Sequence, residues 1–68
     1  MTENERQLVQ ALNADIQRME GIAHYFDKPG IEIDSTVVGR MSGIEFARGI
    51  KAHIAQNREL IEKIQGSR

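Results

Sequence analysis

The chain has 68 residues and a formal net charge of −1, and it contains no cysteine, no tryptophan and one proline. A chain of this length forms a single domain whose core is only marginally stabilising. The absence of cysteine excludes disulfide bonds and thiolate metal sites. The near-neutral charge argues against a nucleic-acid partner, because nucleic-acid surfaces usually carry a basic excess.

No apolar run approaches the roughly 20 residues that cross a bilayer, so no membrane segment is expected. The first ten residues, MTENERQLVQ, lack the basic start and apolar core of a signal peptide. We therefore expect a cytoplasmic protein. Hydrophobic residues make up 40% of the chain, which is enough for it to fold.

The first predicted element is an amphipathic helix over residues 3–27. Thr2 and Glu5 have the spacing of a capping box, and Pro29 disfavours helical geometry at Lys28. At 3.6 residues per turn the apolar residues form one broad stripe, with Val9 at its border: Leu8, Leu12, Ile16, Met19, Ile22, Ala23 and Phe26.

A second helix is predicted over residues 43–65, after a connector at residues 28–42. Ser42 and Glu45 give the start signal of this helix. One face carries most of the apolar residues, with His53 and Asn57 beside them: Phe46, Ala47, Ile50, Ile54, Leu60, Ile61 and Ile64.

The glycine-rich connector allows three interpretations. It could be a helical turn that kinks at Gly39 or Gly43, an ordered loop, or a two-stranded ribbon of IEI and TVV around Asp34-Ser35. Asp-Ser is a poor two-residue hairpin turn, because neither residue accepts a positive φ as glycine does. We therefore favour a helical or irregular segment over the ribbon.

The predicted fold is all-α, a single antiparallel helical hairpin over residues 1–68 that dimerises into a four-helix bundle. Each stripe is broader than a two-helix seam needs, so part of its apolar surface would remain exposed to water in a monomer. The residues concerned are Leu8, Leu12, Ile16, Ile54, Ile61 and Ile64. Pairing two hairpins about a twofold axis would cover this surface. The competing interpretation is a monomer whose middle segment covers the open face.

The titratable residues do not form a catalytic or metal-binding set, so we expect no enzyme activity, no metal and no cofactor. His24 is expected to be a surface residue, and His53 to lie at an interface. Asp15 lies near the border of the apolar stripe, and Arg18 one turn later is its local ion-pair partner. Gly21 and Gly49 interrupt the helices, and close helix contact would explain them.

The expected function is a protein-interaction module that binds and inhibits or regulates a partner protein. The connector and its flanks supply the candidate binding residues Tyr25, Phe26, Arg40, Arg48 and Lys51. The alternative is an oligomeric sponge for a phosphate-bearing small molecule such as a cyclic nucleotide. In that case the basic band of Arg40, Arg48, Lys51 and Arg58 would supply the cations that hold phosphates.

Small cysteine-free helical proteins of this kind are similar in style to phage-encoded inhibitors of host systems. The ten-residue stretch FARGIKAHIA (residues 46–55) resembles the second helix of phage sponges for cyclic oligonucleotides. The resemblance implies a small helical oligomer with a nucleotide ligand. Small phage head-joining proteins offer a second analogy, a helix–hairpin–helix, which requires the ribbon interpretation of the connector and implies a virion component.

Overall fold

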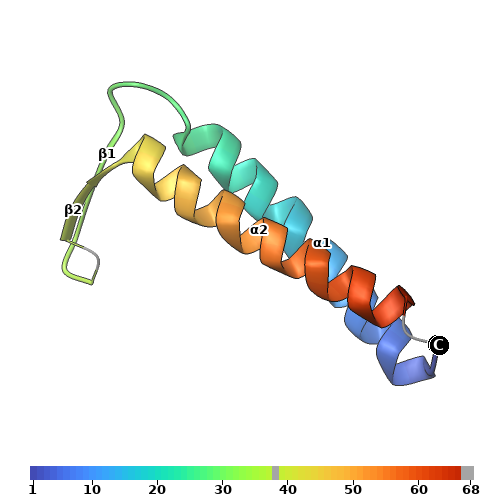
Figure 1. Ribbon diagram of the computed structural model, residues 1–68. Coiled ribbons are helices and arrows are strands. Elements are labelled where there is room, and N and C mark those ends of the chain that lie inside the picture. Colours follow the sequence, from blue (N-terminus) through green and yellow to red (C-terminus); the bar gives the residue numbers. More distant parts are fainter. Residues whose placement is uncertain (38, 67–68) are drawn as a thin grey trace.

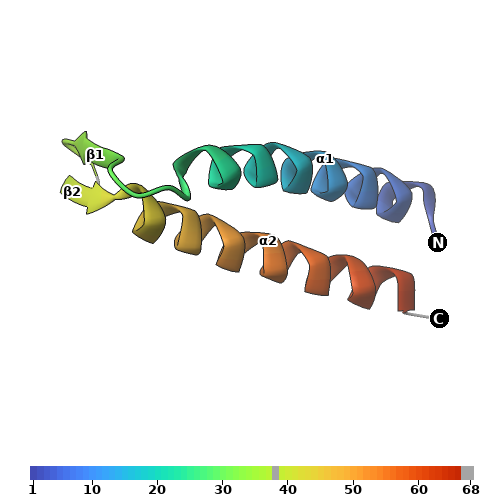
Figure 2. The ribbon, with the colours of Figure 1, turned by 90° about the horizontal axis from the view of Figure 1, so that it is seen from above.

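The computed structural model describes residues 1–37 and 39–66. The elements follow in the order α1 (Glu3–Phe26), β1 (Glu32–Ser35), β2 (Gly39–Ser42) and α2 (Gly43–Gly66). The two helices lie side by side and antiparallel, with the start of α1 and the end of α2 at one end and the strand pair at the other (Figures 1 and 2). The hairpin and its helix boundaries are therefore confirmed to within one residue.

Local capping sets where the helices begin and end. The Thr2 hydroxyl accepts from the Glu5 N–H, and the Glu5 carboxylate accepts from the Thr2 N–H at 2.9 Å. These bonds to Thr2 lower the pKa of the Glu5 carboxyl. The Ser42 hydroxyl accepts from the Glu45 N–H at 3.1 Å and caps α2 in the same way.

The connector contains a two-stranded antiparallel ribbon, so the favoured helical or irregular segment is wrong. The strands also differ from the IEI and TVV pairing, because Ser35 pairs with Gly39 and residues 36 and 37 form a turn. Gly39 has φ of +74°, and the Ser35 hydroxyl accepts from the Val37 N–H at 3.0 Å. Asp34 and Ser35 lie on β1 and need no positive φ, so the objection to an Asp-Ser hairpin turn does not apply. Val38 lies outside the described residues.

The apolar core is a seam in which residues recur alternately three and four positions apart. In a seven-residue repeat lettered a to g, the buried apolar side chains occupy position a of both helices: Val9, Ile16, Ala23, Ala47, Ile54 and Ile61. The half-buried residues of the seam occupy position d: Leu12, Met19, Phe26, Ile50, Asn57 and Ile64.

This repeat corrects the placement of the apolar stripe in α1. Val9, expected at the border, is 6% exposed, whereas Leu8 is 45% exposed. Ile16, Ile54 and Ile61 are likewise buried within the hairpin itself. They are therefore not the surplus surface that the sequence suggested.

Gly43 marks the point where the connector returns to the helix pair. Its N–H donates to the Ile31 carbonyl at 2.8 Å. A Cβ at this position would overlap the Phe26 carbonyl oxygen and lie 3.0 Å from the Ile31 side chain. Gly21 and Gly49 have open space around them, so a close contact between α1 and α2 does not explain them.

Replacing Gly43 with alanine should therefore destabilise the protein, by about 1–3 kcal/mol of unfolding free energy, because backbone must move to admit the methyl group. Gly49→Ala is the matched control in the same helix. It should stabilise by up to about 1 kcal/mol, because it adds helix propensity in open space. Urea denaturation measures the free energy of unfolding of both variants. A Gly43→Ala variant as stable as wild type would contradict the packing described at this junction.

Candidate functional site

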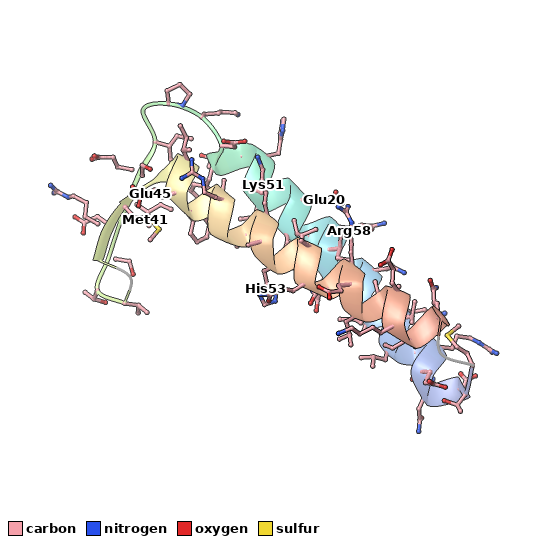
Figure 3. The ribbon with its side chains drawn as sticks, viewed as in Figure 1. Glu20, Met41, Glu45, Lys51, His53 and Arg58 are labelled. Carbon is pink, nitrogen blue, oxygen red and sulfur yellow. The ribbon has the colours of Figure 1, made fainter. Side chains whose placement is uncertain are left out.

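One edge of the helix pair is closed by ion pairs between position e of α1 and position e of α2. Arg58 donates to Glu20 at 2.9 Å, and Lys51 donates to Asp27 at 2.5 Å. The side chains of Glu20, Lys51 and Arg58 lie along the same side of the molecule (Figure 3). The hydrogen bond from Lys51, with the charge of the same lysine, lowers the pKa of the Asp27 carboxyl. We call this edge the charged flank.

A shallow groove runs along the charged flank between the two ion pairs. Ala23 and Ile54 contribute its apolar lining, and His24 also lines it. Each of the two lining cations, Lys51 and Arg58, is already bound to a carboxylate. An anionic ligand would have to compete with Asp27 and Glu20 for these cations.

The opposite edge, formed by position g of both helices, is apolar and uncovered. Leu8, Ile22 and Leu60 are 45%, 42% and 43% exposed. Asp15 and Phe46 are half-buried and His53 is exposed at the same repeat position. In Figure 3, His53 projects from the side of α2 opposite to Lys51 and Arg58. We call these six residues the open flank.

Burial is greatest at position a, next to the charged flank, and decreases from there toward the open flank. Around a helix the repeat positions follow one another in the order e, a, d, g. In this protein position e is ion-paired, position a is buried, position d is half-buried and the apolar residues at position g are mostly exposed. The surplus apolar surface expected from the sequence therefore exists, but it lies at positions d and g.

The candidate binding residues at the strand end form an aromatic cluster. The Phe26 ring makes edge-to-face contacts with Tyr25 and Phe46, at centroid distances of 4.9 and 5.1 Å. The Lys28 ammonium lies 5.6 Å from the centre of the Tyr25 ring. Phe26 is half-buried and Tyr25 is 61% exposed, so Tyr25 is the aromatic side chain that another molecule can reach.

The predicted basic band is divided among separate carboxylates. Arg40 lies on β2 and pairs with Asp34 at 3.9 Å, while Lys51 and Arg58 belong to the charged flank. The exposed Arg48 contributes to lowering the pKa of Asp27. The structure thus brings Lys51 and Arg48 near Asp27, and it leaves Arg40 on the ribbon.

Asp15, another titratable residue singled out in the sequence, has its ion-pair partner within the same helix. Arg18 donates to the Asp15 carboxylate, as the sequence predicted. Among residues 1–37 and 39–66, no group of three or more histidine, aspartate and glutamate side chains could hold a metal ion. Neither α1 nor α2 has an apolar stretch long enough to cross a membrane.

No family model matches this chain, and neither does any curated protein or solved structure. Its function is therefore inferred from the surfaces of the molecule.

Sequence reasoning missed the charged flank, although a signal for it was present. Glu20 and Asp27 are seven residues apart, and so are Lys51 and Arg58. Opposite charges that repeat at this interval on two antiparallel helices indicate paired edge positions of one seam. Recognising these ion pairs requires knowing which positions of the repeat face the other helix. That assignment follows from the burial of Val9 rather than Leu8.

The ion pair between Asp27 and Lys51 predicts a stability contribution that depends on pH. Because the folded pKa of Asp27 lies below its ordinary value of 3.8, the contribution is fully present above that pH. It is lost as the pH falls through the lowered pKa. The difference in unfolding free energy between wild type and Asp27→Asn should thus be positive near neutrality and shrink below about pH 4.

Glu59→Gln is the control for this measurement. It removes an exposed ion pair within α2, in which the Lys63 Nζ and the Glu59 Oε1 lie 3.9 Å apart. Denaturation at pH values between neutrality and strong acid measures both differences. A gap for Asp27→Asn that stays constant across this range would show that the ion pair does not contribute to stability.

Proposed function

We propose that this chain is a small non-enzymatic protein-interaction module. Two hairpins pair as a four-helix bundle, and the strand end of the bundle binds another protein and inhibits or regulates it. The observation that carries the proposal is the ribbon of β1 and β2, which projects beyond the helix pair (Figures 1 and 2). The last turn of α1, which precedes the ribbon in the chain, carries the 61% exposed Tyr25.

The ribbon is suited to contact with another protein. Among the described residues, no third strand lies beside either edge, so both edges offer backbone donors and acceptors to an extended segment. Val37, in the turn, is 89% exposed. An isolated two-stranded ribbon is only marginally stable in water, and a partner that covers it would stabilise both its backbone and its apolar turn.

Charge on the ribbon supplies specificity. Glu32, Asp34 and Arg40 are all exposed, and the pair of Asp34 with Arg40 spans 3.9 Å at the surface. Such a long, exposed pair contributes little to folding. Both groups are therefore available to exchange partners across an interface, where charges select the correct protein and speed its approach.

Self-association is supported by the open flank. It leaves apolar side chains of both helices uncovered along the length of the hairpin. Scattered apolar residues need no explanation, but apolar residues that recur at one repeat position of both helices are typical of a surface that another helix pair covers.

Tyr25→Ala and Arg40→Glu should each weaken binding to the partner protein, by about tenfold or more where the side chain is an anchor of the interface. The partner is first captured from the native host by the tagged wild-type chain and identified by mass spectrometry. Its affinity for each purified variant is then measured by calorimetry.

Lys63→Glu is the matched control for Arg40→Glu. Lys63 also pairs with a carboxylate at 3.9 Å, but it lies near the other end of α2. It should leave the affinity unchanged. Equal affinities for wild type, Tyr25→Ala and Arg40→Glu would rule out the strand end as the binding surface.

The sponge for a phosphate-bearing molecule is the weaker alternative, because Lys51 and Arg58 are already hydrogen-bonded to carboxylates. Under the proposal, cyclic nucleotides should leave the melting temperature unchanged. A nucleotide bound at 100 times its dissociation constant would instead add about 2.7 kcal/mol of stability. Such a shift, abolished by Arg48→Glu, would favour the sponge.

The strand pair also supports a virion component as a second candidate. The analogy with small head-joining proteins requires a ribbon between two helices, and the element order α1, β1, β2, α2 meets that requirement. Light scattering separates the two candidates. A compact dimer at all concentrations favours the interaction module, whereas a ring of many subunits favours the virion component.

A further inference from the structure

The ribbon of β1 and β2 presents its unpaired backbone groups at alternate residues. The Gly43 N–H donates to the Ile31 carbonyl at 2.8 Å. The register continues from this pair, so that Ile33 lies opposite Met41. Because hydrogen-bonded and non-hydrogen-bonded pairs alternate in an antiparallel ladder, Ile33 and Met41 also bond across the ribbon. The residues between these pairs point their backbone donors and acceptors outward, away from the other strand.

The outer edge of β1 is formed by Glu32 and Asp34. The alternation turns one backbone N–H and one carbonyl of each residue to the outside. Within residues 1–37 and 39–66, no third strand pairs with this edge. An extended segment laid along the edge would supply the missing acceptors and donors.

The outer edge of β2 is less accessible than that of β1. The helix α2 begins directly after β2 and packs against it (Figure 1). Ser42, an edge residue of β2, caps this helix, and its hydroxyl accepts from the Glu45 N–H. The carbonyl of a capping residue accepts the first hydrogen bond of the helix. The edge of β2 therefore offers fewer free backbone groups than the edge of β1.

The two faces of the ribbon differ in chemistry. Residues directly opposite each other share a face, and successive residues of a strand alternate between faces. Glu32 and Asp34 are exposed on one face, where Arg40 pairs with Asp34 at 3.9 Å. Ile33 and Met41 form a half-buried pair on the other face. A strand added to β1 would continue a charged row on one face and an apolar row on the other.

We propose that the edge of β1 binds an extended segment of a partner protein in which basic and apolar residues alternate, and that this segment runs antiparallel to β1. This inference rests on the proposed function, because it specifies how the strand end binds its partner. Two basic side chains would lie opposite Glu32 and Asp34, and the apolar side chain between them would lie beside Ile33. Antiparallel pairing is slightly more stable per residue than parallel pairing.

Charge selects a basic segment rather than a second copy of this chain. Asp34 pairs with Arg40, whereas Glu32 lies opposite the uncharged Ser42. Two copies paired antiparallel along their β1 edges would bring Glu32 of one copy to Asp34 of the other. Like charges directly opposite each other on a sheet are destabilising. A basic segment turns the same two positions into attractive pairs.

Amide NMR spectroscopy tests this edge with a defined probe. The isotope-labelled chain is titrated with a capped peptide that alternates lysine and valine. The amide signals of Glu32 and Asp34 should shift, and their hydrogen exchange should slow. A peptide that alternates glutamate and valine should bind about tenfold more weakly or worse. Shifts confined to Arg40 and Ser42, or no binding of the lysine–valine peptide, would overturn the proposal.

Methylation of the peptide backbone tests how the two strands pair. In an antiparallel ladder, the peptide residues opposite Glu32 and Asp34 exchange both hydrogen bonds with them. A peptide methylated at the backbone nitrogens of its lysines should therefore lose binding, whereas one methylated at the backbone nitrogens of its valines should retain it. The reverse result overturns the antiparallel orientation, and equal binding of the two peptides overturns strand addition.

Glu32→Lys tests the charge of the edge. It should weaken binding of the lysine–valine peptide by about fivefold or more, because an attractive pair becomes repulsive. Glu62→Lys is the matched control, since it makes the same change of charge at an exposed position near the far end of α2. It should leave the affinity unchanged, and the amide spectrum verifies that each variant keeps its ribbon. An equal loss in both variants would attribute binding to net charge and overturn the proposal.

The outcomes separate this inference from the function on which it rests. Arg40 lies on β2, across the ribbon from the proposed edge, so it would contact the partner outside the added segment. If the lysine–valine peptide does not bind but Tyr25→Ala or Arg40→Glu weakens binding of the captured partner, the inference fails and the proposed function stands. If the peptide binds but the partner binds Glu32→Lys, Tyr25→Ala and Arg40→Glu as it binds wild type, both are overturned.

Discussion

The register of two antiparallel helices on a seven-residue repeat is the constraint on which the rest of this structure depends. Each helix has an apolar surface that spans positions a, d and g, but a single neighbouring helix buries only position a completely. The core is therefore a narrow line of branched and small side chains, with partly wet residues along one edge. Within residues 1–37 and 39–66, no further layer of helix or sheet covers them.

The two edges of the seam differ in chemistry: one is charged and the other is largely apolar. Carboxylates on α1 meet cations on α2 along the charged flank, so that edge satisfies its own groups within one chain. The open flank is apolar apart from Asp15 and His53. Water can solvate the charged edge at little cost, whereas apolar side chains at the other edge gain free energy only when something covers them. This asymmetry supports self-association through one face and leaves the strand end free.

The strand end is positioned by a close approach of backbone to backbone. Gly43 lies against the Phe26 carbonyl and donates to Ile31, so α2 begins directly where the ribbon ends. The aromatic contacts of Phe26 with Tyr25 and Phe46 pack the end of α1 against the start of α2. As a result the ribbon is a projection with a fixed base. Of the five candidate binding residues, Arg40 lies on the ribbon and is exposed, and Tyr25 and Arg48 are exposed on the helices. Phe26 is half-buried and Lys51 is held by Asp27.

The sequence by itself determined the two helices, because their ends depend on neighbours in the chain: Thr2 with Glu5, Ser42 with Glu45, and Pro29 after α1. It also determined that the apolar stripes are too broad for one another. Only the tertiary structure decided that the connector is a ribbon, because its register depends on pairing across the turn and on the positive φ of Gly39. Only the packing of α1 on α2 decided that Val9 is buried and Leu8 exposed. Adjacent residues on a helix differ by about 100° in direction, and the position of the neighbouring helix selects which of the two it covers.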